Sequence, residues 1–334
     1  MIDIKTGDCR DILKTLDEKS IDTCITSPPY WGLRDYGKSD QLGLEDTPEE
    51  FVENLVNVFR EVKRVLRDDG TVWLNLGDTY CSSRPMGTSG NSDNVGNAYK
   101  KHRESFDFGR TGKTSKVGTN EYRGRGKAVD GLKMKDLIGI PWRVALALQA
   151  DGWYLRQDII WHKPNPMPES VNDRCTKAHE YIFLLSKNPK YYFDNEAIKE
   201  DCVGKDERKW SDSYDNVGSI IQGDTNADIK RTKRYSKDGN FKRNKRSVWT
   251  VTTKPFKGAH FATFPMDLIE PCVLAGCPEG GTVLDPFGGS GTTGLVADRH
   301  KRNAVLIELN PDYIDIAGDR LKGDAPLFSD IKLP

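Results

Sequence analysis

The 334-residue chain lacks a long apolar run and lacks an excess of charge of either sign. No apolar run approaches the roughly 18 residues that a membrane helix requires, and the N-terminus lacks the apolar core of a signal peptide. We therefore expect a cytoplasmic protein without a membrane partner. Its 50 basic and 50 acidic residues balance, so any contact with nucleic acid must come from local clusters of basic side chains.

Paired cysteines are lacking as well. The chain has 7 cysteines, which are scattered and form no C-x-x-C pair, so the sequence predicts neither a zinc site nor a disulfide framework. We expect no metal, and we expect most of the cysteines to be buried among apolar side chains.

The most informative feature that is present is the segment 26–31, with the sequence TSPPYW. It follows residues 21–25, which have the pattern of a short buried strand, so the two prolines lie where a strand must stop. Prolines lack N–H groups and keep the backbone extended, so the loop presents carbonyl oxygens and the Ser27 hydroxyl beside the ring of Tyr30. A planar group with an NH2 fits this arrangement. The alternative is an ordinary strand-ending turn with a half-buried tyrosine.

A second motif, GTVLDPFGGSGTT, occupies residues 281–293. It has the pattern of a short apolar strand, the acid Asp285, a glycine-rich turn and a helix start, which is how an open α/β sheet presents a nucleoside-type ligand. It is neither a phosphate-binding P-loop nor a dinucleotide fingerprint. Glu308 comes at the tip of the next predicted strand, directly after residues 303–307, and is an acid that can accept hydrogen bonds from both ribose hydroxyls.

Together, TSPPYW near the start and VLDPFGGSGTT near the end resemble the motifs of amino-methylating DNA methyltransferases in the arrangement called beta class. In that arrangement the catalytic motif precedes the cofactor motif and target recognition lies between them, which is the order found here. The resemblance covers roughly residues 1–78, 132–194 and 247–321. It implies S-adenosyl-L-methionine as cofactor, double-stranded DNA as partner, and the Rossmann-like fold of class I methyltransferases.

Strand-like and helix-like patterns alternate along much of the chain, which predicts an α/β fold with a doubly wound, mostly parallel sheet and a small target-recognition insertion. Residues 1–194 form the expected catalytic half, with a flexible basic insertion at about 79–131. Residues 195–247 form the expected target-recognition region, and residues 248–334 the cofactor-binding half. Predicted helices cover 49–66, 134–149 and 268–275, and predicted strands cover 71–76, 154–161 and 181–186.

The resemblance implies a role for each motif residue. Tyr30 stacks on a flipped-out base, and acceptors at Ser27 and Pro28 hold the hydrogens of its amino group. Asp285 and the glycine-rich turn place the methionine end of the cofactor, Glu308 the ribose, and Asp8 the adenine amino group. The catalytic candidates are Ser27, Pro28, Pro29 and Tyr30. The cofactor-binding candidates are Asp8, Phe264, Asp285, Phe287, Gly288, Gly289, Ser290, Gly291 and Glu308.

Two basic stretches, about 79–131 and 195–247, are candidates for DNA contact. A disordered surface insertion and a solvated charge run are the alternatives. The DNA-binding candidates are Trp31, Arg34, Arg123, Arg125, Lys233, Arg234, Lys245 and Arg246.

The residue at position 27 bears on which base is modified. Serine there resembles cytosine-N4 enzymes, whereas aspartate or asparagine resembles adenine-N6 enzymes, so we favour site-specific cytosine-N4 methylation and keep adenine-N6 open. Protein glutamine and RNA are less favoured substrates, and a non-catalytic DNA-binding protein is a further alternative. A homodimer, and a cognate restriction endonuclease acting separately, also stay open.

Cys272 follows a proline, as the nucleophile of cytosine-C5 methyltransferases does, but it lies in the helix predicted over 268–275, and transfer to an exocyclic nitrogen needs no covalent intermediate.

Overall fold

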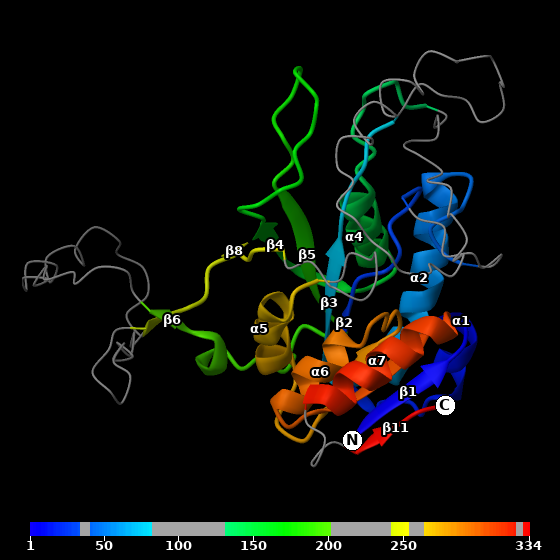
Figure 1. Ribbon diagram of the computed structural model, residues 1–334, viewed down its shortest axis with the longest axis vertical. Helices are drawn as coiled ribbons and strands as arrows, with labels where there is room; N and C mark the ends of the chain where they lie inside the picture. The colour runs from blue at the N-terminus through cyan, green and yellow to red at the C-terminus, as the bar shows by residue number, and fades with distance from the viewer. Residues whose placement is uncertain (34–40, 82–130, 202–241, 254–263, 325–329) are drawn as a thin grey trace, which may run out of the picture.

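The structure is a computed structural model that describes residues 1–33, 41–81, 131–201, 242–253, 264–324 and 330–334. Within these residues, nine strands form one sheet in the order β11-β1-β10-β9-β2-β3-β5-β4-β8, and Figure 1 labels most of them. β5 is antiparallel to its neighbours β3 and β4, and the other pairings are parallel. The strands are β1 (Ile2–Thr6), β2 (Ile21–Thr26), β3 (Leu66–Leu76), β4 (Tyr154–His162), β5 (His179–Ser186), β8 (Val248–Thr250), β9 (Thr282–Asp285), β10 (Asn303–Glu308) and β11 (Ile331–Lys332).

Helices cover both faces of this sheet, so the predicted α/β, doubly wound and mostly parallel fold is confirmed. Among the described residues, no helix is both long and apolar enough to span a membrane. The helices are α1 (Cys9–Ile12), α2 (Pro48–Val65), α4 (Ile140–Ala150), α5 (Met266–Gly276), α6 (Thr292–Arg299) and α7 (Pro311–Asp324), with short 3-10 turns at Leu13–Thr15 and Glu196–Ile198.

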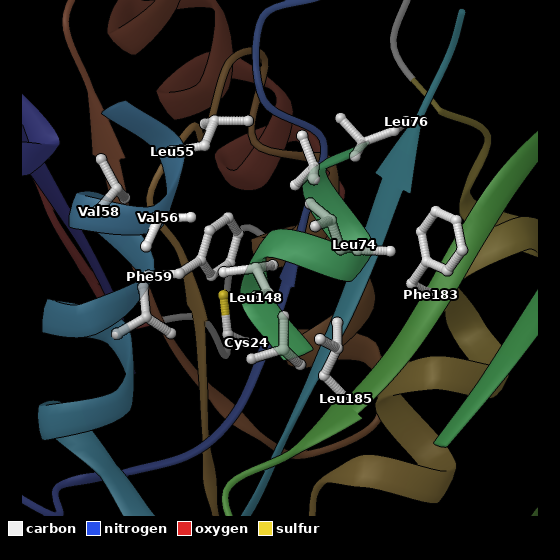
Figure 2. Packing of buried hydrophobic residues seen from close by; sticks show 14 of the residues in the cluster. Cys24, Leu55, Val56, Val58, Phe59, Leu74, Leu76, Leu148, Phe183 and Leu185 are labelled. Atoms are coloured by element: carbon white, nitrogen blue, oxygen red, sulfur yellow. The ribbon is translucent and has the colours of Figure 1, made fainter. Parts of the chain in front are cut away.

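Two hydrophobic cores lie on opposite faces of the sheet, because successive side chains of a strand point to opposite sides. In β3, Leu74 and Leu76 belong to the core under α2 and α4, whereas Trp73 belongs to the core under α5, α6 and α7. Figure 2 shows the first of these cores, in which Phe59 and Leu148 from the two helices meet the sheet. Burial on both faces explains why the predicted strands at 71–76 and 181–186 are almost continuously apolar.

Helix α2 begins where the sequence predicts a helix, and its start has an identifiable cause. Thr47 accepts a hydrogen bond from the Glu50 amide at 3.2 Å, and the Glu50 carboxylate accepts one from the Thr47 amide at 3.2 Å. This capping box, with Pro48 in the first turn, satisfies amides that the helix leaves unpaired.

The helix predicted over 134–149 is wrong at its start, because α4 begins at Ile140. Pro141 lies in the first turn of α4, where its missing N–H costs nothing, and Gly139 precedes the helix with a φ of 79°. A proline that suits a first turn therefore marks the beginning of this helix rather than a kink within a longer one. The helix predicted around Cys272 is confirmed as α5.

The sheet has a topological switch point between its neighbouring strands β2 and β9. The chain leaves β2 for α2 on one face of the sheet and leaves β9 for α6 on the other face. In open α/β sheets, the connections that leave two such strands turn to opposite faces, and ligands bind in the crevice outside the carboxyl ends of the strands. The TSPPYW loop follows β2 and the glycine-rich turn follows β9, so the two predicted motifs meet at this point.

A separate two-stranded sheet pairs β6 (Glu200–Asp201) with β7 (Lys242–Arg243). These strands flank residues 202–241, which lie outside the described part of the chain, as do residues 82–130 of the predicted basic insertion. The division into a catalytic half, a target-recognition region and a cofactor-binding half stays a prediction.

Candidate active site

Asp285 joins the two motifs. Its Oδ1 accepts a hydrogen bond from the Thr26 hydroxyl at 2.6 Å, and its Oδ2 accepts one from the Thr293 hydroxyl at 2.6 Å. The Phe287 amide also donates to Oδ1, at 3.1 Å. Asp285 therefore connects the end of β2, the turn after β9 and the first turn of α6.

Asp285 is 1 % exposed, so its carboxylate lies beneath the two loops that it holds together. Burial raises the pKa of Asp285, and the hydrogen bonds from Thr26, Thr293 and Phe287 offset only part of that rise. The role expected for Asp285, placing the methionine end of the cofactor, is compatible with this position.

The glycine-rich turn, residues 288–291, packs closely against α7 and β10 on one side and is open on the other side. A Cβ at Gly291, where φ is +77°, would lie 2.9 Å from the Ala317 Cβ on α7, and one at Gly288 would lie 3.0 Å from the Leu306 Cβ. Gly289 has a φ of +51°, and a Cβ there would meet nothing closer than the Phe287 carbonyl oxygen at 3.9 Å. The glycines thus let α7 and β10 approach closely and leave the outer side of the turn accessible to a ligand.

Ser290 is held by Arg320 of α7. The Arg320 guanidinium donates to the Ser290 hydroxyl at 2.7 Å, to the Ser290 carbonyl, and to the Thr292 hydroxyl at 3.1 Å. This contact fixes the turn from the helix side and was not predicted from the sequence.

Glu308 ends β10 beside the same turn. Its Oε2 accepts a hydrogen bond from the Gly289 amide at 2.8 Å, and its Oε1 accepts one from the Asn310 amide at 2.8 Å. Burial raises the pKa of Glu308, although these backbone hydrogen bonds partly counter the rise. Each carboxylate oxygen has further acceptor capacity, so a ribose diol can be bound in addition to the two amides.

Asp8 lies after β1 and caps the short helix α1. Its Oδ1 accepts from the Arg10 amide at 2.8 Å, and its carboxylate also pairs with the Arg10 guanidinium. Burial raises the pKa of Asp8, but the hydrogen bonds and charge of Arg10 outweigh it, so the pKa lies below its ordinary value. Of the two expected aromatic neighbours of the cofactor, half-buried Phe264 packs against the core under α5, and Phe287 against the opposite core.

The TSPPYW loop places Tyr30 against β3. Pro28 is buried, whereas Ser27, Pro29 and Tyr30 are half-buried. The Tyr30 hydroxyl lies 2.8 Å from Glu180 Oε2 and 3.2 Å from Asn75 Oδ1. Glu180, Asn75 and their neighbours are functional candidates that the motifs did not indicate.

Trp31 corrects an expectation. Its side chain is 1 % exposed in the core under α2, and its indole N–H donates to the Glu45 carbonyl at 3.0 Å. An indole buried in this way packs the loop onto the protein, so the prediction that Trp31 contacts DNA is not supported by its position.

Only two of the other DNA-binding candidates lie within the described residues. Lys245 is half-buried with its ammonium 5.1 Å from the centroid of the Trp249 ring, and exposed Arg246 donates to Glu200 Oε1 at 2.7 Å. Arg34, Arg123, Arg125, Lys233 and Arg234 lie outside the described residues. Cys272 is 1 % exposed inside α5, and burial raises the pKa of its thiol, which disfavours the nucleophilic thiolate.

This site defines a class of protein. A doubly wound sheet places a glycine-rich turn and a strand-ending acid beside a rigid loop of acceptors and a tyrosine ring, as a methyltransferase acting on a planar amino group requires. The open side of Gly289, the acceptor capacity of Glu308 and the neighbouring Asp8 fit S-adenosyl-L-methionine.

Comparison with known proteins specifies the family. A family model described as DNA methylase, of the N6/N4 type, matches residues 21–319. The chain is 46% identical over 318 residues to the type II methyltransferase M.Cfr9I of Citrobacter freundii, covering 95% of this chain and 87% of that protein. It is 44% identical over 318 residues to the type II methyltransferase M.SmaI of Serratia marcescens, covering 95% and 90%.

Solved structures agree in fold. The PvuII DNA methyltransferase, described as cytosine-N4-specific, matches with a TM-score of 0.58 at 19% identity, covering 96% of this chain and 86% of that one. A putative DNA modification methylase of Thermus thermophilus, complexed with S-adenosyl-L-methionine, matches with a TM-score of 0.57 at 22% identity, covering 99% and 97%. The chain belongs to the N6/N4 family of DNA methyltransferases.

Proposed function

We propose that this protein methylates the exocyclic amino group of a flipped-out base in double-stranded DNA, with cytosine N4 as the favoured acceptor. The hydrogen bond between Thr26 and Asp285 carries the proposal, because it brings the Ser27–Tyr30 loop beside the glycine-rich turn. The type II relatives support site-specific methylation of DNA. Serine at position 27 supports cytosine over adenine, which is the second candidate.

The chain's own residues must expose and hold the base. Flipping a base out of a duplex costs a few kcal/mol, and stacking on Tyr30 returns about 1–3 kcal/mol of that. The amino lone pair is delocalised into the ring, so the nitrogen becomes nucleophilic when the amino group turns pyramidal. The Ser27 hydroxyl and the Pro28 carbonyl accept its two hydrogens and favour that geometry. When bound, S-adenosyl-L-methionine supplies an electrophilic methyl group.

Residues on the β9, β10 and β1 side hold the cofactor. The turn at Gly288, Gly289, Ser290 and Gly291 receives the methionine end, Glu308 the ribose and Asp8 the adenine amino group. Phe264 and Phe287 pack near it. Asp285 contributes by holding the turn and the end of β2 in one arrangement.

Partners and location follow from a DNA substrate. We place the protein in the cytoplasm, with residues 195–247 reading the DNA and Arg34, Arg123, Arg125, Lys233 and Arg234 contacting it. The type II relatives also favour a restriction endonuclease that acts separately on the same site. A homodimer is a further proposal that sedimentation can test.

The deciding experiment incubates the protein with isotope-labelled S-adenosyl-L-methionine and mixed-sequence duplex DNA, digests the DNA to nucleosides and identifies the labelled product by mass spectrometry. We expect N4-methylcytosine. Labelled N6-methyladenine would overturn the choice of base and leave the mechanism standing. No label in DNA would overturn the proposed substrate.

The variant Tyr30→Ala should retain cofactor affinity and lose turnover.

A further inference from the structure

The hydroxyl of Tyr30 is held by a carboxylate far away in the sequence. Glu180 lies near the start of β5, and its Oε2 is 2.8 Å from the Tyr30 hydroxyl oxygen. Asn75 Oδ1 is a second acceptor at 3.2 Å, and its amide in turn donates to the Tyr181 carbonyl at 3.0 Å. A phenol that donates to an ionised carboxylate makes a stronger hydrogen bond than one that donates to a neutral acceptor.

Glu180 is itself held in place. Its Oε1 forms an ion pair with the Lys163 ammonium, and the two side chains are 17% and 18% exposed. Lys163 follows β4, whose residue Trp161 is paired with Glu180 across the sheet. The Lys163 ammonium also lies 4.1 Å from the centroid of the Trp161 ring. Backbone pairing, an ion pair and a cation–π contact therefore fix the carboxylate that faces Tyr30.

The ring of Tyr30 is restrained along its length as well. A Cβ at Gly77, just after β3, would lie 2.9 Å from the Tyr30 Cδ2 and closer still to Cε2, so only glycine lets the ring lie there. The Pro28-Pro29 backbone fixes one end of the tyrosine and Glu180 fixes the other. A stacking surface that is already in place loses little entropy when a base arrives.

We propose that Glu180, held by Lys163, is a positioning residue that fixes the Tyr30 ring as the stacking surface for the target base. The inference rests on the proposed function, in which Tyr30 stacks on that base. Glu180 acts through the Tyr30 hydroxyl and leaves the cofactor site unchanged. Its loss therefore slows turnover without weakening the binding of S-adenosyl-L-methionine.

A double-mutant cycle tests this role with Tyr30→Phe, Glu180→Ala and the combined variant. Single-turnover methylation of duplex DNA is measured at saturating cofactor, and cofactor affinity is measured by calorimetry. We expect each single change to slow the methyl-transfer rate about tenfold and the combined change to slow it no further, with cofactor affinity unchanged. Losses that multiply to about a hundredfold would overturn the inference, because Glu180 would then act independently of the hydroxyl.

Two variants support the cycle. Glu61→Ala is the matched control, since Glu61 is a partly exposed carboxylate that pairs with Arg64 on α2 at 2.8 Å, and its rate should equal that of the wild type. If Glu180→Ala does not fold, Lys163→Met replaces it, because the Glu180 carboxylate then loses its ion pair. This change should slow methyl transfer in the protein that has Tyr30 and should not slow it in the Tyr30→Phe variant. Equal slowing in both backgrounds would overturn the inference.

The contact can be tested without activity. Melting temperatures of the same four proteins without cofactor report the coupling between Tyr30 and Glu180, and we expect the combined variant to melt higher than the sum of the single shifts predicts. Additive shifts would show that no such contact exists and overturn the inference. A wild-type protein that labels no DNA would contradict the proposed function alone, and this stability coupling would still decide whether Glu180 holds Tyr30.

Discussion

At the scale of single residues, the site combines acids that have different tasks. Asp285 is buried and its oxygens accept hydrogen bonds from Thr26, Thr293 and Phe287, whereas Glu308 binds two backbone amides at the edge of the turn. Burial raises the pKa of both carboxyls. The first holds the two motifs together, and we propose that the second contacts the cofactor that binds beside the turn.

The variant Asp285→Asn should lose about 1–3 kcal/mol of unfolding free energy, since the asparagine NH2 cannot accept the hydrogen bond that one of the Thr26 and Thr293 hydroxyls donates. The loss should depend on pH. Burial raises the pKa of Asp285 in the folded protein above its value in the unfolded chain. The contribution of this group to the unfolding free energy of the wild type is therefore full below the unfolded pKa and is lost as the pH rises through the folded pKa. The asparagine does not titrate, so the deficit should be largest in acid and shrink toward neutral pH. Denaturant titrations across this range measure it, and a deficit that grows with pH would contradict the interpretation.

Gly77→Ala should displace the Tyr30 ring, because the added methyl group would overlap it. We expect methyl transfer to fall about 100-fold with cofactor affinity unchanged, as a misplaced stacking surface predicts. Single-turnover rates and calorimetry measure the two quantities. Gly323→Ala is the control, since a Cβ there meets nothing within 4 Å. A Gly77→Ala enzyme with the wild-type rate would show that the ring can move without consequence.

What the sequence predicts at this scale depends on whether a motif is contiguous. Ser27 to Tyr30 directly follow β2, and Asp285 and Glu308 are the last residues of β9 and β10, so their positions at the sheet edge follow from the strands. Glu180 and Arg320 were missed, because their partners Tyr30 and Ser290 are chosen by strand register and helix packing between segments 150 and 30 residues apart. Trp31 was assigned wrongly, because an aromatic residue after a loop suits both a surface contact and a core position.

At the scale of elements, helix α7 holds the glycine-rich turn in place. Ala317 lies under Gly291, and Arg320 donates to the Ser290 carbonyl and hydroxyl. Helices and strands were predicted from the periodicity of apolar residues. The start of α4 was predicted wrongly, because the position of a proline determines it rather than apolar periodicity. Pro141 suits a first helical turn, so α4 starts at Ile140 although apolar residues precede it.

Arg320→Met should weaken the binding of S-adenosyl-L-methionine about tenfold, because the turn loses hydrogen bonds from a charged donor. Calorimetry with the cofactor alone measures this. Arg299→Met is the matched control. Arg299, at the end of α6, pairs with Asp324 of α7, and this contact lies away from the glycine-rich turn. Equal affinities for Arg320→Met and wild type would show that the turn keeps its shape without the clamp.

At the scale of the whole molecule, the fold explains why two motifs far apart in the sequence form one site. Parallel strands place their carboxyl ends at one edge of the sheet, and the switch point between β2 and β9 lies at that edge. Pattern and motif order therefore predicted the class of fold, and the two predicted motifs meet at one edge of the sheet. The DNA-contacting surface was less predictable, because a chain with balanced charge shows only local basic clusters, and exposure of each side chain depends on packing.

Arg246 tests where DNA lies on the molecule, because the structure supplies an opposing pair of variants. Arg246 is exposed and donates to Glu200 Oε1, an acceptor that it shares with Arg243. If this surface contacts phosphates, Arg246→Ala should weaken DNA binding and reduce the slope of log affinity against log salt by about 1. Glu200→Gln removes the competing carboxylate, so it should strengthen binding instead. Fluorescence anisotropy with duplex DNA at several salt concentrations measures both, and Lys19→Met, which removes an exposed ion pair with Asp68, controls for a general loss of positive charge. Unchanged slopes in both variants would remove this surface from the DNA-binding face.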